Sequence, residues 1–144
     1  DKVNGETDQA DCELAWTSFK CATRLFRFMW NGFAQGKGIL SGHIHQGNKA
    51  LNQIRIHPNE KPYELYRWIL TNYARPGDKI FDPMMGSQSS RIAAWDMGFD
   101  YWGCEKDVDY FRDGEARFKK HVANKTTLFT PDQMYDFKQT TLDL

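Results

Sequence analysis

The sequence predicts an α/β fold in which short parallel strands alternate with helices. A short strand over residues 79–81 leads into a loop of small residues and then into the helical pattern of residues 92–97. A second short strand, residues 101–104, follows and ends at Glu105. Strands that alternate with helical patterns are typical of βαβ units. A chain of 144 residues is long enough for one domain with its own core.

The loop after the first strand is the predicted ligand site. It contains Gly86 and three serines, and the helix begins directly after it. The exposed N–H groups of a first helical turn allow a polar ligand to approach the backbone. Glu105 lies about 23 residues after Asp82, where an acidic side chain can accept hydrogen bonds from ribose hydroxyls. The loop and Glu105 together therefore predict a site for a ligand with a ribose.

Further elements flank this unit on both sides. Residues 11–19 and 22–30 are rich in apolar side chains on both faces, so we expect a pair of strands at a covered edge of the sheet. Helices are expected at residues 63–73, with Pro62 in the first turn, and at residues 108–121, with Asp107 as the N-cap. Residues 125–129 suggest one more strand, and residues 130–144 form a polar tail.

Charge is unevenly distributed, although the net charge is zero. Residues 14–59 contain six Lys or Arg and no acidic residue. Within them, residues 31–56 are irregular, rich in glycine and amides, and carry Lys37, Lys49 and Arg55. Cationic side chains neutralise phosphates, and amides and guanidinium groups read base edges. This segment predicts a contact with a polyanion; the alternative is a solvated surface insertion without a partner.

Several function classes are disfavoured. Three cysteines, Cys12, Cys21 and Cys104, have spacings that fit neither a disulfide framework nor a zinc site, so we expect buried thiols in a reducing cytoplasm. His43 and His45 have no third ligand nearby, so no metal site is expected. No apolar run approaches the roughly 20 residues that cross a bilayer, and no membrane contact is expected.

Two motifs carry a family resemblance. His57-Pro58-x-Glu60-Lys61-Pro62 precedes a helix, and Asp82-Pro83-x-x-Gly86-Ser87 follows a strand. Over residues 11–122 this order resembles the C-terminal half of amino-group DNA methyltransferases, most closely phage-type adenine-N6 enzymes. The resemblance implies a Rossmann-like fold, S-adenosylmethionine (SAM) as cofactor and double-stranded DNA as partner, in a bacterial or phage-infected cell. It implies SAM contacts at His57, Lys61, Asp82, Pro83, Met84, Gly86, Ser87, Gln88 and Glu105, and DNA contacts at Lys37, Lys49 and Arg55.

The sequence departs from the family pattern in two places. Gln88 stands where the family usually has a second glycine, so its side chain would crowd the methionine part of SAM or make a polar contact instead. The family's catalytic Asp/Asn-Pro-Pro-Tyr/Phe tetrapeptide does not occur, so no catalytic residue is assigned. We interpret residues 1–144 as one partial methyltransferase domain that lacks the central strands and is inactive alone. Its parts are edge strands (11–30), a target-recognition-like loop (31–56), a SAM-binding half (57–129) and a tail (130–144).

Three alternatives remain open. The chain could be a non-catalytic SAM- or DNA-binding fragment that associates with its missing N-terminal half, another chain or a second copy. A dinucleotide-binding oxidoreductase would use the same strand–loop–helix–acid order, but the G-x-G-x-x-G spacing is absent. Residues 139–144 resemble the Gln-x-x-Leu-x-Leu peptides that bind bacterial sliding clamps.

Overall fold

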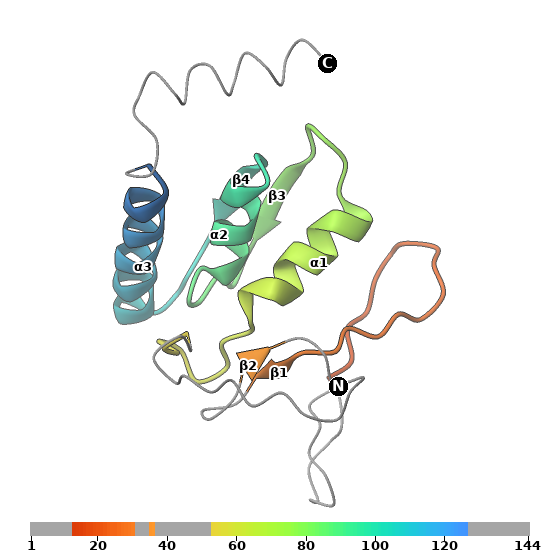
Figure 1. Ribbon diagram of the computed structural model, residues 1–144, viewed down its shortest axis with the longest axis horizontal. Helices are drawn as coiled ribbons and strands as arrows, with labels where there is room; N and C mark the ends of the chain where they lie inside the picture. Colours follow the sequence, from red (N-terminus) through yellow and green to blue (C-terminus); the bar gives the residue numbers. More distant parts are fainter. Residues whose placement is uncertain (1–12, 31–34, 37–52, 127–144) are drawn as a thin grey trace, which may run out of the picture.

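The computed structural model describes residues 13–30, 35–36 and 53–126 of the chain. This part is a mixed α/β structure with three helices, one parallel two-stranded sheet and one short antiparallel pair of strands (Figure 1). The elements in chain order are β1 (Met29–Trp30), β2 (Gln35–Gly36), α1 (Tyr63–Tyr73), β3 (Lys79–Asp82), α2 (Ser89–Asp96), β4 (Asp100–Gly103) and α3 (Val108–Thr126).

The predicted βαβ unit is confirmed. Strands β3 and β4 are parallel, with Ile80 opposite Tyr101 and Phe81 opposite Trp102, and α2 connects them. Side chains alternate between the two faces, since Ile80 and Tyr101 pack toward the core while Phe81 and Trp102 are 63% and 51% exposed. The helices therefore cover one face of this sheet, and its other face carries two adjacent exposed aromatic side chains.

The core lies between α1, α2 and the inner face of the sheet. Ala93 and Ala94 of α2 are fully buried and touch Leu70 of α1, because their small side chains let the two helices approach closely. Around this contact pack partly buried side chains from every neighbouring element: Tyr63, Tyr66, Ala74, Ile80, Met97, Phe99 and Tyr101. In Figure 1, α2 lies between α1 and α3, so it is the central helix of the described part.

Helix α3 begins as predicted but ends later. The Asp107 Oδ1 atom accepts the N–H groups of Asp109 and Tyr110 at 2.9 and 3.0 Å, as an N-cap side chain should. The helix continues to Thr126, so the prediction of a strand was wrong for residues 125 and 126, and residues 127–129 lie outside the described part. A bond from Lys125 Nζ to Asp96, 2.7 Å long, fastens the last turn to α2.

The predicted strand pair near the N-terminus is wrong for residues 13–28. Strand β1 is confined to Met29–Trp30, and its partner is β2 rather than an earlier segment. Side chains over residues 13–25 are exposed, and Trp16 is 98% exposed. A strand needs a neighbour to complete its hydrogen bonds, and nothing in the described residues pairs with this segment. Its apolar side chains instead contact α1 locally, with the Phe26 ring 5.6 Å from that of Trp68.

The expectation of buried thiols was also wrong where it can be checked. Cys21 and Cys104 are both exposed, and Cys12 lies outside the described residues. Cys21 belongs to the exposed N-terminal segment, and Cys104 continues the outward alternation of β4. Over the described ranges, no group of three His, Cys, Asp or Glu side chains is arranged to hold a metal ion. None of the helices that the structure describes is long and apolar enough to span a bilayer.

Candidate functional site

The loop between β3 and α2 is closed by the side chain of Asp82. The Asp82 Oδ1 atom accepts the N–H of Met84 at 3.0 Å, and Oδ2 accepts the hydroxyl of Ser90 at 2.6 Å. The Ser90 hydroxyl is also 2.9 Å from the hydroxyl of Tyr101 on β4. Asp82 therefore fixes both ends of the loop, the end of the strand and the first turn of the helix.

Glu105 binds the same loop from the end of β4. Its Oε1 atom accepts the Asp107 N–H at 2.9 Å, and its Oε2 atom accepts the Gly86 N–H at 2.8 Å. The backbone N–H groups of Asp107 and Gly86 lower the pKa of this carboxyl, which stays ionised at neutral pH. Since a carboxylate offers about four acceptor positions, Glu105 keeps capacity for further donors.

Gly86 lies between Glu105 and His57, and the space that these three residues border is called the hollow below. Its φ of +46° is in the left-handed region that glycine adopts most readily. A Cβ atom at Gly86 would lie 3.7 Å from His57 Cδ2 and 4.0 Å from Glu105 Oε2. The His57 ring packs edge-on against Tyr110 of α3, with 4.3 Å between ring centroids. The fold thus brings three predicted site residues together from three separate segments.

Gln88 does not crowd this hollow. Its φ is +61°, and its side chain is fully buried against α3, where a Cβ atom on Gly114 would lie only 2.7 Å from Gln88 Cγ. The side-chain amide donates to Glu115 at 3.2 Å and accepts from Arg91 at 2.8 Å. These polar contacts of Gln88 are internal to the protein, and its expected effect on SAM stays a prediction.

Other predicted cofactor residues lie further out. Lys61 Nζ is 2.7 Å from Glu13 Oε2, an ion pair with the N-terminal segment. Pro83 and Met84 are exposed, whereas the neighbouring Met85 is buried and its N–H donates to the Cys104 carbonyl at 3.0 Å. These positions border the loop without joining the hollow between His57, Gly86 and Glu105.

The predicted DNA contacts are only partly visible. Lys37, Lys49 and residues 139–144 lie outside the described residues. Arg55 is exposed, and its guanidinium lies 4.9 Å from the centre of the Trp30 ring and donates to the Trp30 carbonyl. Arg55 is therefore positioned by an aromatic ring at the start of the glycine-rich segment.

Sequence reasoning missed two charged residues behind the hollow. Arg117 Nη1 donates to the Ser87 carbonyl at 2.7 Å and lies 3.2 Å from Glu60 Oε1. Glu60 belongs to a quoted motif, but it was given no role. Arg117 shares the buried face of α3 with Tyr110 and Gly114, at helical spacings of four and three residues. A search for apolar periodicity alone overlooks such a face, since a glycine and an arginine interrupt it.

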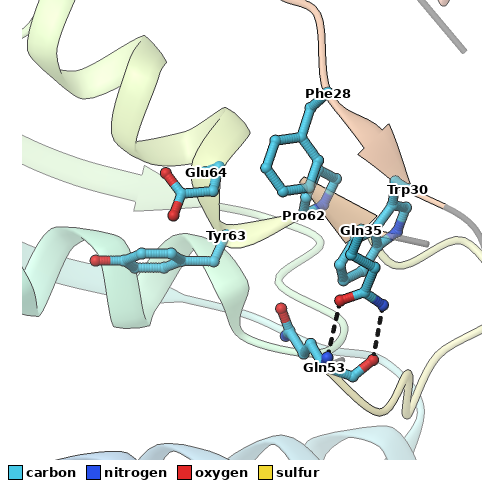
Figure 2. A pocket seen from close by; sticks show the side chains of 7 residues that line it. All are labelled: Phe28, Trp30, Gln35, Gln53, Pro62, Tyr63 and Glu64. Atoms are coloured by element: carbon cyan, nitrogen blue, oxygen red, sulfur yellow. Dashed lines mark hydrogen bonds between the residues drawn. The ribbon is translucent and has the colours of Figure 1, made fainter. Parts of the chain in front are cut away.

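A separate pocket of about 250 Å³ lies between the β1–β2 pair and the start of α1. Figure 2 shows its lining, which is Phe28, Trp30, Gln35, Gln53, Pro62, Tyr63 and Glu64. The Gln35 side chain bonds the backbone of Gln53 in both directions, at 2.9 and 2.8 Å. This lining contains none of the predicted cofactor residues, so we place the candidate site at the β3–α2 loop on the chemistry of its side chains.

The structure is that of an α/β protein with a loop of small residues between a strand and a helix and an acidic residue after the second strand. A DNA methylase family profile matches residues 4–116. The chain belongs to this DNA methylase family.

Two curated proteins are similar over part of their length. The chain is 35% identical to "Putative methylase YubD" of Escherichia coli (strain K12) over 63 residues, 44% of this chain and 28% of that protein. It is 23% identical to "Type II methyltransferase M.HinfI" of Haemophilus influenzae over 120 residues, 77% of this chain and 33% of that protein. The chain thus spans about a third of the curated relatives it matches. No solved structure matches it.

Proposed function

We propose that this chain forms the SAM-binding part of a Rossmann-like DNA methyltransferase that methylates the N6 amine of adenine. Family membership supports DNA methylation, and the resemblance to adenine-N6 enzymes supports the choice of target. The observation that carries the proposal is the ionised Glu105 carboxylate, held beside the Gly86 N–H at the carboxyl end of a parallel strand.

The residues of the hollow have distinct roles in this proposal. Glu105 accepts the ribose hydroxyls, and Gly86 lets the cofactor approach its backbone because it has no side chain. The His57 ring, braced by Tyr110, forms the opposite wall. SAM supplies the electrophilic methyl group when bound. The Asp82 carboxylate keeps the loop closed on α2, so the site is preorganised rather than assembled by the ligand.

DNA binding is assigned to the cationic segment that precedes the hollow. Lys37, Lys49 and Arg55 would neutralise phosphates, and such contacts weaken as salt concentration rises. The sequence contains no Asp/Asn-Pro-Pro-Tyr/Phe tetrapeptide, so we assign the binding of the target base to another segment or chain. Such an enzyme would act in the cytoplasm of a bacterial or phage-infected cell.

The test is a calorimetric titration of SAM into the chain, repeated with Glu105→Ala and Asp100→Ala. Asp100 is an exposed carboxylate at the opposite end of the same strand, so it controls for a general effect of removing charge. We expect saturable binding that Asp100→Ala preserves and that Glu105→Ala weakens at least about tenfold, the effect of losing hydrogen bonds to a charged acceptor. Absence of binding, or equal binding by both variants, would contradict the proposal.

A second candidate function is association with another chain through the outer face of the sheet. Phe81 and Trp102 are neighbours in the parallel register, and both are more than half exposed. Exposed aromatic side chains on a sheet face favour burial against a partner. Sedimentation of the chain, with Phe81→Ser and Trp102→Ser as variants, separates the cases. A concentration-dependent dimer that both variants dissociate supports association, whereas a monomer at all concentrations argues against self-association.

A further inference from the structure

An arginine on α3 connects the two segments that form the candidate site. Arg117 Nη1 donates to the Ser87 carbonyl at 2.7 Å and to the Ser89 hydroxyl at 3.0 Å, and it lies 3.2 Å from Glu60 Oε1. Ser87 and Ser89 belong to the loop and first turn that follow Gly86, and Glu60 belongs to the turn that carries His57. One nitrogen atom therefore contacts both the loop that follows Gly86 and the turn that carries His57.

We propose that Arg117 and Glu60 are positioning residues, which hold the loop at residues 86–89 and the turn at residues 57–62 in the arrangement that binds the cofactor. This inference rests on the proposed function, because it concerns the same hollow. Neither residue is assigned a contact with SAM. They act through Ser87, the neighbour of Gly86, and through His57.

The Glu60 side chain is completely buried, and its partners within the described residues are donors. Oε1 accepts the Gln53 side-chain amide at 2.9 Å and faces Arg117, and Oε2 accepts the Ile56 N–H at 2.9 Å. A buried carboxylate is tolerated only when it is paired and hydrogen-bonded. Removal of Arg117 would leave this charge without its cation, so the turn would have to move to reach water.

That movement would reach the site by a short path. The Glu60 backbone N–H donates to the His57 carbonyl at 3.1 Å, so a shift of Glu60 pulls on the residue whose ring faces Gly86. On the loop side, Arg117 holds the carbonyl of Ser87, the residue directly after Gly86. Burial lowers the pKa of Arg117, and the charge of Glu60 opposes this effect. The guanidinium stays protonated at any physiological pH.

The far end of α2 offers a matched control. Asp96 is a buried carboxylate there, with His121 Nε2 at 2.8 Å and Lys125 Nζ at 2.7 Å, both on α3 like Arg117. Asp96 also accepts from the Tyr63 hydroxyl of α1. Asp96→Asn therefore removes a buried negative charge from a cluster whose members lie on α1, α2 and α3 rather than in the loop or the turn. If Asp96→Asn lowers stability but leaves SAM affinity unchanged, a loss of affinity in the Arg117 and Glu60 variants reflects lost positioning rather than lost stability.

The experiment compares SAM affinity and backbone amide exchange in Arg117→Met, Arg117→Lys, Glu60→Gln and Asp96→Asn. Met fills the space of Arg without donors, whereas Lys keeps a charge and three donors. Both oxygens of Glu60 accept from donors. In Glu60→Gln one oxygen becomes an NH₂ group, which faces a donor in either orientation of the amide and cannot accept its hydrogen bond. We expect the Met and Gln variants to bind SAM about tenfold or more weakly and Lys to recover part of the loss. Asp96→Asn should bind like the unaltered chain.

Amide exchange provides a readout that does not depend on SAM. The N–H groups of Gly86 and Gln88 are bonded to Glu105 and to the Met85 carbonyl, and we expect Arg117→Met to speed their exchange while Asp96→Asn leaves it unchanged. Unchanged exchange and affinity in Arg117→Met, or equal losses in Arg117→Met and Asp96→Asn, would overturn the positioning role. If the unaltered chain binds no SAM, the proposed function fails, and the exchange of these two amides alone decides the positioning role.

Discussion

The two ends of α2 carry similar polar clusters with different partners. At the C-terminal end, the buried Asp96 carboxylate accepts from Tyr63 of α1 and from His121 and Lys125 of α3. At the N-terminal end, Arg117 of α3 binds the loop and the turn instead. Each cluster fastens α2 to its neighbours, but only one of them contacts segments that lack regular structure.

The two clusters also differ in where their cationic side chains lie along the α2 dipole. The His121 ring and the Lys125 ammonium lie at the negative end of the α2 dipole, where electrostatics favours the charge of Lys125. Arg117 lies at the positive end of the same helix, where a cation is disfavoured and where burial lowers its pKa. The Glu60 carboxylate, 3.2 Å from Arg117 Nη1, opposes this unfavourable effect, so the N-terminal cluster depends on a buried counter-charge.

The largest expected effect is on stability, from the C-terminal cluster. Asp96→Ala leaves the Tyr63 hydroxyl, the His121 ring and the Lys125 ammonium without their shared acceptor. We expect the free energy of unfolding to fall by about 3 kcal/mol, with a decrease in Tm of about 10 °C. SAM affinity measured well below Tm should change by less than about twofold. A loss of affinity as large as the one expected for Arg117→Met would remove the distinction between the two ends.

The next effect concerns the packing of α2 against α3. Gln88, at the start of α2, fills the space beside Gly114 of α3. Gly114→Ala would place a methyl group 2.7 Å from Gln88 Cγ. We expect a loss of about 1–3 kcal/mol in chemical denaturation, because overpacking forces side chains and backbone to shift. In Gln88→Ala/Gly114→Ala the added methyl should meet no obstacle, so the two losses should not add. Additive losses would show that Gln88 and Gly114 are not in contact.

Much of the scaffold was predictable from sequence, because local patterns determine it. Residues 79–81 and 101–104 read as strands from short apolar runs between turn residues, and Asp107 caps α3 as its side chain predicts. The site was predictable in part, since the motifs placed His57, Gly86 and Glu105 in order along the chain. Glu105 meets the loop at Gly86 because β3 and β4 are parallel, as the βαβ order predicts. The approach of His57 does not follow from that order, since His57 lies outside the sheet.

The remaining features depend on long-range contacts that no local pattern encodes. The segment over residues 13–28 has the apolar alternation of a strand but no neighbour in the described part of the chain, so its pattern alone misled. The role of Arg117 depends on a turn 57 residues earlier in the sequence, which its helical position does not reveal. The sequence also left the orientation of the Gln88 side chain open, because the space that it fills depends on the distant residue Gly114.

A smaller effect concerns the pH dependence of the C-terminal cluster. Burial raises the pKa of Asp96, but bonds from His121, Lys125 and Tyr63 outweigh it, so the pKa is lower than 3.8 in the folded chain. This stabilisation is fully present above about pH 4 and is lost as pH falls through the folded-state value. Thermal melts between pH 2 and 7 should therefore show a shallower acid loss for Asp96→Asn than for the unaltered chain. Parallel acid profiles would contradict the assignment.

The smallest effect is expected at Lys61, whose ion pair with Glu13 is largely solvated, with side chains 37% and 49% exposed. Lys61→Met should change the free energy of unfolding by less than about 0.5 kcal/mol, as is usual for exposed pairs. Calorimetry of the same variant with SAM then tests its predicted cofactor contact separately. Unchanged affinity would restrict the site to the hollow between His57, Gly86 and Glu105.

The proposed position of the SAM site can be tested by mapping backbone amide chemical shifts during a titration with SAM. We expect the saturable changes to concentrate in residues 57–61, 82–88 and 105–107, at the N-terminal end of α2. Residues 96–98 and 121–125, at the other end, should change little. Changes centred on that C-terminal cluster, or no saturable change in the loop, would contradict the assignment of the site.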